Sequence, residues 1–144
     1  MIHEIKDEGN VLAIIVSRNF KKEGIEFFTP GSFSQQLGYM QRPKGYLIEP
    51  HDHNPVVREV HLTQEVLFIK SGKVRVDFYT SDRSYLKSVA LEQGDVILLA
   101  SGGHGFRMIE DSEIIEVKQG PYCGDLDKTR FSSIDETKVK CYEF

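Results

Sequence analysis

Short segments rich in β-branched and aromatic residues recur along this chain, and turn-forming Gly, Pro, Asn and Ser residues separate them. In residues 74–79 the side chains alternate, because Val74, Val76 and Phe78 share one face of an extended chain. Many short strands at this spacing are typical of an antiparallel sandwich or barrel, so we predict an all-β fold. The expected strands are 11–16, 25–28, 65–70, 74–79, 88–92, 95–100 and 113–118.

The size and charge of the chain limit the kinds of protein it can be. A chain of 144 residues without a repeat or linker predicts one domain over residues 1–144. Its net charge of −4 is interleaved along the sequence, which argues against binding to nucleic acid or an anionic membrane. No apolar run approaches the length of a membrane span, and the first residues are acidic where a signal peptide is basic. We therefore expect a cytoplasmic protein.

The C-terminal residues 121–144 differ from the rest because they are polar and weakly periodic. They are expected to form a C-terminal extension that covers a sheet edge, packs on a second subunit or stays solvated. Cys123 and Cys141 belong to no C-x-x-C pair and are interpreted as reduced structural thiols. With so little sulfur, a metal site in this chain would use nitrogen and oxygen ligands.

Three of the five histidines lie close together, at His51, His53 and His61. The spacing of His51 and His53 places both rings on one face of a strand, as chelation requires. Three imidazoles and a carboxylate suit a divalent transition metal such as Fe, Mn, Ni or Zn. Exposed histidines beside the turn at Asn54-Pro55 are the simpler interpretation of the same pair.

One carboxylate and one imidazole further along the chain strengthen the interpretation as a metal site. Glu65 begins an apolar segment in which Leu67 and Ile69 follow on the same face, so its carboxylate is expected to face the core. A carboxylate in that position is costly unless it is paired or metal-bound. His104 follows a hydrophobic strand in a glycine-rich stretch that can approach a ligand closely.

These residues carry a family resemblance. Glu65 with Gly72 and the strand after it resembles the second half of the first cupin motif, and "GDVILLASGGHGFRM" (94–108) resembles the second cupin motif. The resemblance spans about residues 45–118. It implies a single-domain antiparallel β-barrel, or jelly roll, with a metal held inside by two His and a Glu from the first motif and a His from the second. Because small cupins commonly pair, it also implies a homodimer.

The sequence departs from the cupin pattern in both motifs. Eleven residues separate His53 from Glu65, where the family has three or four. At the family spacing the H-x-H pair would fall on Glu59 and His61, so a glutamate replaces the first histidine. In the second motif Ala100 stands where proline is usual, Met108 stands where asparagine is usual, and the gap from glycine to histidine is one residue shorter.

Two ligand sets therefore compete, and a mixture of them is also open. The preferred set is His51, His53, Glu65 and His104, with a hairpin turn at 54–55 and one long strand after it. The alternative replaces the first two residues with Glu59 and His61. Four further side chains are candidates for the polar lining of a substrate pocket, namely Tyr46, Arg58, Gln64 and Arg107.

The expected function is that of a metal-binding cupin for a small molecule. The segments around both motifs resemble stand-alone cupins that accompany polysaccharide or nucleotide-sugar biosynthesis, which favours a sugar- or carboxylate-related ligand. If the chain is an enzyme, the resemblance implies a metal-dependent isomerase, epimerase or dioxygenase. The alternative is a binding module that holds a small ligand without turnover, because the cupin fold serves both purposes.

Overall fold

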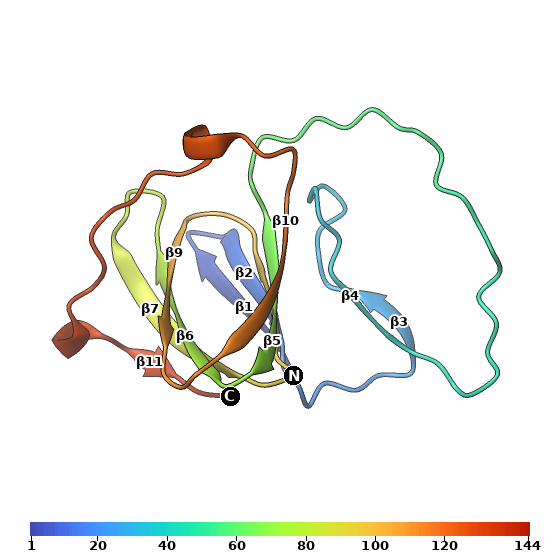
Figure 1. Cartoon of the computed structure of the whole chain (residues 1–144), viewed down its shortest axis with the longest axis horizontal. Coiled ribbons are helices and arrows are strands. Elements are labelled where there is room, and N and C mark those ends of the chain that lie inside the picture. Colours follow the sequence, from blue (N-terminus) through green and yellow to red (C-terminus); the bar gives the residue numbers. More distant parts are fainter.

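The computed structural model describes residues 1–144 and consists of strands, loops and two short 3₁₀ helices (Figure 1). The helices are η1 (Gly124–Asp127) and η2 (Glu136–Lys138), and neither is long or apolar enough to cross a membrane. All seven segments that the sequence predicts as strands are strands, within three residues at their ends. The strands are β1 (Ile2–Asp7), β2 (Asn10–Val16), β3 (Gly24–Phe27), β4 (Gly38–Gln41), β5 (Glu65–Ser71), β6 (Lys73–Tyr79), β7 (Tyr85–Glu92), β8 (Val96–Leu99), β9 (Gly103–Met108), β10 (Glu113–Lys118) and β11 (Cys141–Tyr142).

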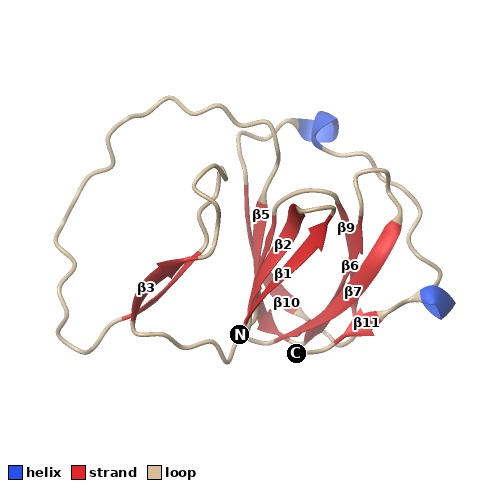
Figure 2. Ribbon diagram, turned by 180° about the vertical axis from the view of Figure 1, so that it is seen from behind, coloured by secondary structure: helices blue, strands red, loops and turns tan.

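Two sheets make up the body of the protein. The five-stranded sheet has the order β1-β2-β8-β5-β10, and the four-stranded sheet has the order β11-β7-β6-β9. Neighbouring strands are antiparallel except β11, which pairs parallel with β7. Figures 1 and 2 show the sheets as two layers on either side of a common interior. The predicted all-β fold is confirmed, and none of its sheets is closed into a barrel.

The hydrophobic core lies between the two sheets because the inward faces of their strands are apolar. Leu67 and Ile69 of β5 pack there with Val74, Val76 and Phe78 of β6, and all five are buried. Gly72 makes the tight connection between β5 and β6, with φ at +80°, and a Cβ at this position would lie 2.2 Å from the carbonyl oxygen of Asp111. Only glycine suits both the backbone angle and the space.

The outer face of β6 is buried as well, because the C-terminal segment lies across it. Arg75 donates hydrogen bonds from Nε and Nη2 to both carboxylate oxygens of Asp77, at 2.7 and 3.0 Å. Its Nη1 and Nη2 also donate to Glu136 of η2, at 2.8 and 2.9 Å. β11 then adds to the edge of the sheet beside β7. A buried guanidinium needs such partners, so this ion pair holds the C-terminal segment in place.

β3 and β4 form a separate hairpin that is attached to the outer face of the five-stranded sheet. Ile14, Leu98 and Ala100 of that face are buried under a segment that contains Phe28, Phe33 and Leu37. From β4 the chain runs through residues 42–64 to β5 without any strand or helix. The expected hairpin at 54–55 and the long strand after it are therefore wrong, because β5 begins only at Glu65 and no strand of this chain lies beside residues 56–62.

The contact between Glu136 and Arg75 predicts how stability depends on pH. Hydrogen bonds from Arg75 lower the pKa of Glu136 from 4.5 to about 2, and the charge of Arg107 adds to the effect. Because the folded state binds this proton more weakly than the unfolded state, its contribution to stability is complete above about pH 4.5 and is lost as the pH falls towards 2. The Glu136→Gln variant should therefore be less stable than the wild type at pH 7, and the difference should shrink on acidification.

Urea unfolding followed by circular dichroism at a series of pH values measures this difference. A gap between the two proteins that stays constant from pH 7 to pH 3 would contradict the assignment of the ion pair as the clamp on the C-terminal segment.

Candidate functional site

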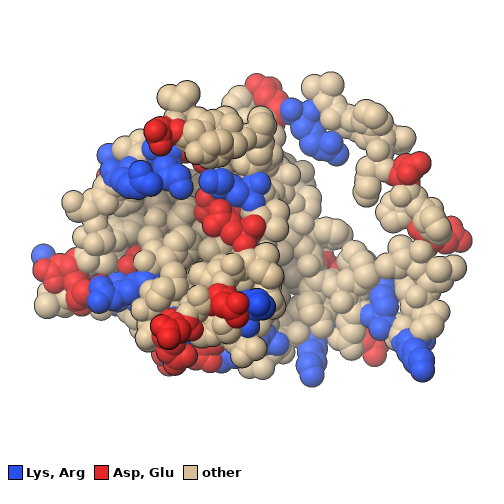
Figure 3. All heavy atoms as spheres, in the orientation of Figure 1, with Lys and Arg blue, Asp and Glu red and all other residues tan.

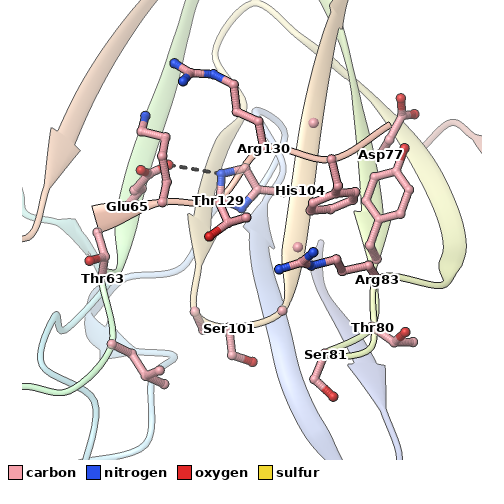
Figure 4. A pocket seen from close by; sticks show the side chains of 18 of the residues that line it. Thr63, Glu65, Asp77, Thr80, Ser81, Arg83, Ser101, His104, Thr129 and Arg130 are labelled. Atoms are coloured by element: carbon pink, nitrogen blue, oxygen red, sulfur yellow. Dashed lines mark ion pairs between the residues drawn. The ribbon is translucent and has the colours of Figure 1, made fainter. Parts of the chain in front are cut away.

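Glu65 and His104 face each other inside the mouth of the two sheets (Figure 4). Glu65 is the first residue of β5, and it points to the same side as the core residues Leu67 and Ile69, as the sequence predicts. His104 lies on β9 opposite the buried Phe78 of β6, so it also faces inward. The Nε2 atom of His104 is 3.2 Å from Oε2 of Glu65.

The environment of Glu65 favours its ionised form. The hydrogen bond from His104 lowers the pKa of the Glu65 carboxyl, and this effect outweighs burial, which raises it. The charges of His104, Lys118 and Lys128 lower it further. An ionised Glu65 accepts a hydrogen bond from Nε2–H of His104, and in the neutral ring this leaves the acceptor lone pair on Nδ1. His104 lines the pocket, and its Nδ1 has no hydrogen-bond partner within the chain.

The pocket around this pair has a volume of about 730 Å³ and is built from four parts of the chain. β5 and β9 supply Glu65 and His104, the loop between β6 and β7 supplies Arg83, and the C-terminal segment supplies Lys128 and Arg130. None of these three cations makes a salt bridge or a side-chain hydrogen bond. Figure 3 shows basic side chains grouped beside the hollow between the sheets.

The acids in the same walls are already paired. Asp127 accepts a hydrogen bond from Thr63 at 2.6 Å and lies 3.4 Å from the Nζ of Lys118. Glu65 is paired with His104. Asp127 is offset by Lys118, and Glu65 is offset by His104 only when that ring is protonated. Arg83, Lys128 and Arg130 still outnumber Glu65, so the pocket has an excess of positive charge.

The C-terminal wall of the pocket is positioned by aromatic packing. The ring of Phe131 meets Tyr79 edge to face, with centroids 5.1 Å apart. It also lies where a Cβ on Gly103 would be, 2.8 Å from its nearest atom, so a side chain at Gly103 would displace it. Arg83 stacks over the same ring, with its guanidinium carbon 5.6 Å from the centroid. Phe131 thus connects the Arg83 loop to the segment that carries Lys128 and Arg130.

The structure does not bring the remaining predicted ligands to Glu65 and His104. His51 and His53 are exposed in the loop 42–64, with their rings 5.3 Å apart, and His51 Nδ1 lies 2.9 Å from the carbonyl oxygen of Glu49. Glu59 and His61 form an exposed ion pair at 3.0 Å, although His61 reaches the rim of the pocket. No group of three or more His, Cys, Asp or Glu side chains converges on one point.

The four predicted pocket residues lie away from the Glu65 and His104 pair. Gln64 is buried, and its side-chain oxygen accepts hydrogen bonds from Ser34 and Gln35. Arg107 donates to Glu136. Tyr46 and Arg58 are exposed in the loop 42–64.

Sequence reasoning missed the three free cations of the pocket. Arg83 and the residues 128–130 belong to a turn and a polar segment without periodicity, so no pattern places them near Glu65. One signal was available in principle, because polar turns that follow β-strands often carry binding residues.

No protein-family model, curated protein or solved structure matches this chain.

Proposed function

We propose that this chain binds a small anionic molecule, sugar- or carboxylate-related, in the pocket around Glu65 and His104. The observation that carries the proposal is the set of three cations, Arg83, Lys128 and Arg130, that line the cavity without forming a salt bridge. Phosphate and carboxylate groups are the ligands that such cations recognise. The cupin motifs at Glu65 and His104 and the two facing sheets support a cupin-like, jelly-roll arrangement for the same site.

The backbone at Arg83 supports a functional reason for this side chain. Arg83 has φ at +69°, in the left-handed region that favours glycine, and it is one of two non-glycine residues with a positive φ. An arginine in this conformation costs roughly 1 kcal/mol relative to glycine. Its guanidinium lies over the Phe131 ring but makes no ion pair within the chain, and the ligand proposed here would supply the missing anionic partner.

The Glu65 and His104 pair could also transfer protons. The carboxylate of Glu65 orients the imidazole, and the open Nδ1 of His104 can accept a proton from a carbon next to a carbonyl group. The carboxylate then stabilises the imidazolium ion that results. This chemistry suits an isomerase or epimerase acting on the anionic ligand, and binding without turnover is the alternative.

A metal at this site stays a prediction. Glu65 and His104 would supply two of the four expected donors, with the Lewis acidity of a metal such as Fe, Mn, Ni or Zn available to a bound carbonyl. In this structure, however, the two donors are hydrogen-bonded to each other, and His51 and His53 lie outside the pocket. The donor set of the single chain is therefore incomplete.

Replacing Arg83 with glycine should separate ligand binding from stability. Glycine relieves the left-handed backbone and loses the contact with Phe131, so the free energy of unfolding should change by less than about 1 kcal/mol. Affinity for glucose 1-phosphate or glucuronate should fall by about tenfold or more, because a charged hydrogen bond is lost. Isothermal titration calorimetry measures the affinity, with neutral glucose as the comparison ligand.

Glu8→Gly is the matched control, because Glu8 is the other non-glycine residue with a positive φ and lies in the turn between β1 and β2. It should stabilise the protein and leave binding unchanged. Equal affinity for charged and neutral sugars, or full binding by Arg83→Gly, would contradict the proposal.

Removing the imidazole of His104 should raise the pKa of Glu65 in the metal-free protein. The hydrogen bond from His104 is the largest cause of the lowered pKa, and burial, which acts in the opposite direction, remains in His104→Ala. Carboxyl-carbon NMR titration of both proteins measures the change. His61→Ala removes an exposed histidine that is paired with Glu59, so it serves as the control and should leave the Glu65 curve in place. An unchanged Glu65 pKa in His104→Ala would show that the pair is not formed in solution.

Metal binding can be tested by elemental analysis of tag-free protein after reconstitution. A stoichiometric site should lose its metal in Glu65→Gln and in His104→Ala, and His51→Ala should weaken metal binding more than His61→Ala. Less than about 0.1 metal ion per chain would contradict a metal centre and leave the anion site to stand alone.

A further inference from the structure

The loop between β4 and β5 arches away from the body of the protein over residues 42–58, and residues 59–63 at its end line hollows against the body. Every residue from 42 to 63, here called the arm, is exposed. Its one backbone hydrogen bond joins Tyr46 to Pro43, and Thr63 at its end is the only residue whose side chain bonds outside the arm. Figures 1 and 2 show the arm as a wide arch, and Figure 3 shows open space between it and the sheets.

The composition of the arm is not that of a solvated linker. Apolar side chains are spread along it and face water, with Val57 at 99%, Leu47 at 75% and Val56 at 60% exposure. Segments that remain extended in solvent are poor in such residues, because water disfavours their exposure. Loops of this length without their own structure are uncommon in compact domains and are usually functional.

The second half of the arm also has the pattern of a strand. In residues 56–62 one face holds Val56, Arg58, Val60 and Leu62, and the other holds Val57, Glu59 and His61, so the first face is apolar except at Arg58. A strand of this kind needs a neighbour for its backbone N–H and C=O groups, and no strand of this chain lies beside it. The arm therefore has both apolar side chains and backbone groups without partners.

A complementary surface exists on the five-stranded sheet. β10 is its edge strand, so one side of its backbone is unpaired. Ile115 and Val117 of β10 are 53% and 59% exposed, and Phe68 beside them on β5 is 38% exposed. An unpaired edge next to an exposed apolar face is a suitable place for an additional strand.

The arm cannot reach this surface of its own chain while its root keeps its present contacts. Gln64, directly after the arm, is buried, and its side-chain oxygen accepts hydrogen bonds from Ser34 and Gln35. Its backbone carbonyl accepts hydrogen bonds from the backbone of Gln119 and the side chain of Gln35. These bonds fix Gln64 beside Gln119, at the end of β10 where the ladder with β5 stops, and from this fixed root the arm leads away from the sheets (Figures 1 and 2).

We propose that the arm is exchanged with a second copy of this chain, so that residues 56–62 of each copy pack on β10 and β5 of the other. A two-fold dimer buries the arm and the exposed sheet face at once, because each copy carries both surfaces. His51 and His53 lie in the middle of the arm, so they leave their own chain in this arrangement. Their absence from the pocket that contains Glu65 and His104 is a consequence of the exchange.

Sedimentation analysis of the full chain over a range of concentrations tests the dimer. The double variant Val56→Asp and Val60→Asp places charges on the apolar face of the arm and should raise the dissociation constant of the dimer by roughly 30-fold or more. Its circular dichroism spectrum should stay that of the wild type, because these side chains are exposed in the single chain. Leu126→Asp is the matched control, since Leu126 in η1 is 95% exposed and lies outside the arm.

A photo-crosslinking amino acid at position 57 tests where the arm lies. Unlabelled and ¹⁵N-labelled chains are mixed by dilution and reconcentration, then irradiated, and the cross-linked peptides are identified by mass spectrometry. The expected products join a labelled arm to unlabelled peptides from β5 or β10, or an unlabelled arm to labelled peptides from these strands. The same crosslinker at position 126 should give no such products.

Three results would overturn the proposal. The first is that the wild-type chain stays monomeric up to its solubility limit. The second is that the double variant in the arm dimerises as tightly as the wild type. The third is that all cross-links from position 57 join peptides of the same chain. If the double variant fails to fold, the cross-linking of the otherwise unchanged chain still decides between exchange and a fold back onto the same chain.

Discussion

The buried guanidinium of Arg75 organises the half of the structure that sequence patterns describe least well. It lies on the outer face of β6, where it contacts Asp77 of its own strand and Glu136 of the C-terminal segment. Because a buried cation is costly without partners, the segment that carries Glu136 must lie across the sheet. The preceding residues then pass over the open end of the sheets, which places Lys128 and Arg130 at the pocket. The positive charge of the site thus depends on an ion pair that lies outside it.

A strand could be predicted from the sequence where its residues alternate and are largely apolar. It could not be predicted where the segment is a strand only because it pairs with a neighbouring strand. β6 and β8 are recognisable because the inward side of each is apolar. β9, in contrast, has the sequence GHGFRM, which contains two glycines and little apolar surface. It is a strand because β6 offers it a full antiparallel ladder from Val74 to Tyr79. Such pairing is a tertiary effect, and local propensity does not contain it.

The residues of the candidate site also divide into those that the sequence could place and those that it could not. Glu65 and His104 could be located because each is attached to a strand whose inward face is visible in the sequence, and these two residues do lie together. Arg83, Lys128 and Arg130 belong to a turn and an irregular segment, so their positions follow from contacts such as the packing of Phe131 on Tyr79. The H-x-H pair illustrates the opposite error. Its spacing describes how two rings lie relative to each other, and it contains no information about where their segment goes.

The arm connects these observations. The alternation in residues 56–62 indicates a strand, and within one chain that prediction is wrong because the strand has no neighbour. Residues 56–62 still have a high propensity for β-strand and apolar side chains, so they still require a neighbouring strand. The exposed edge and face of β10 offer such a partner, and in the proposed exchange, with Gln64 fixed at the root of the arm, they offer it on another copy of the chain. A pattern that contradicts the fold of a single chain is then consistent with the fold of two, and the same argument explains why His51 and His53 are distant from the pocket that their sequence spacing suggested.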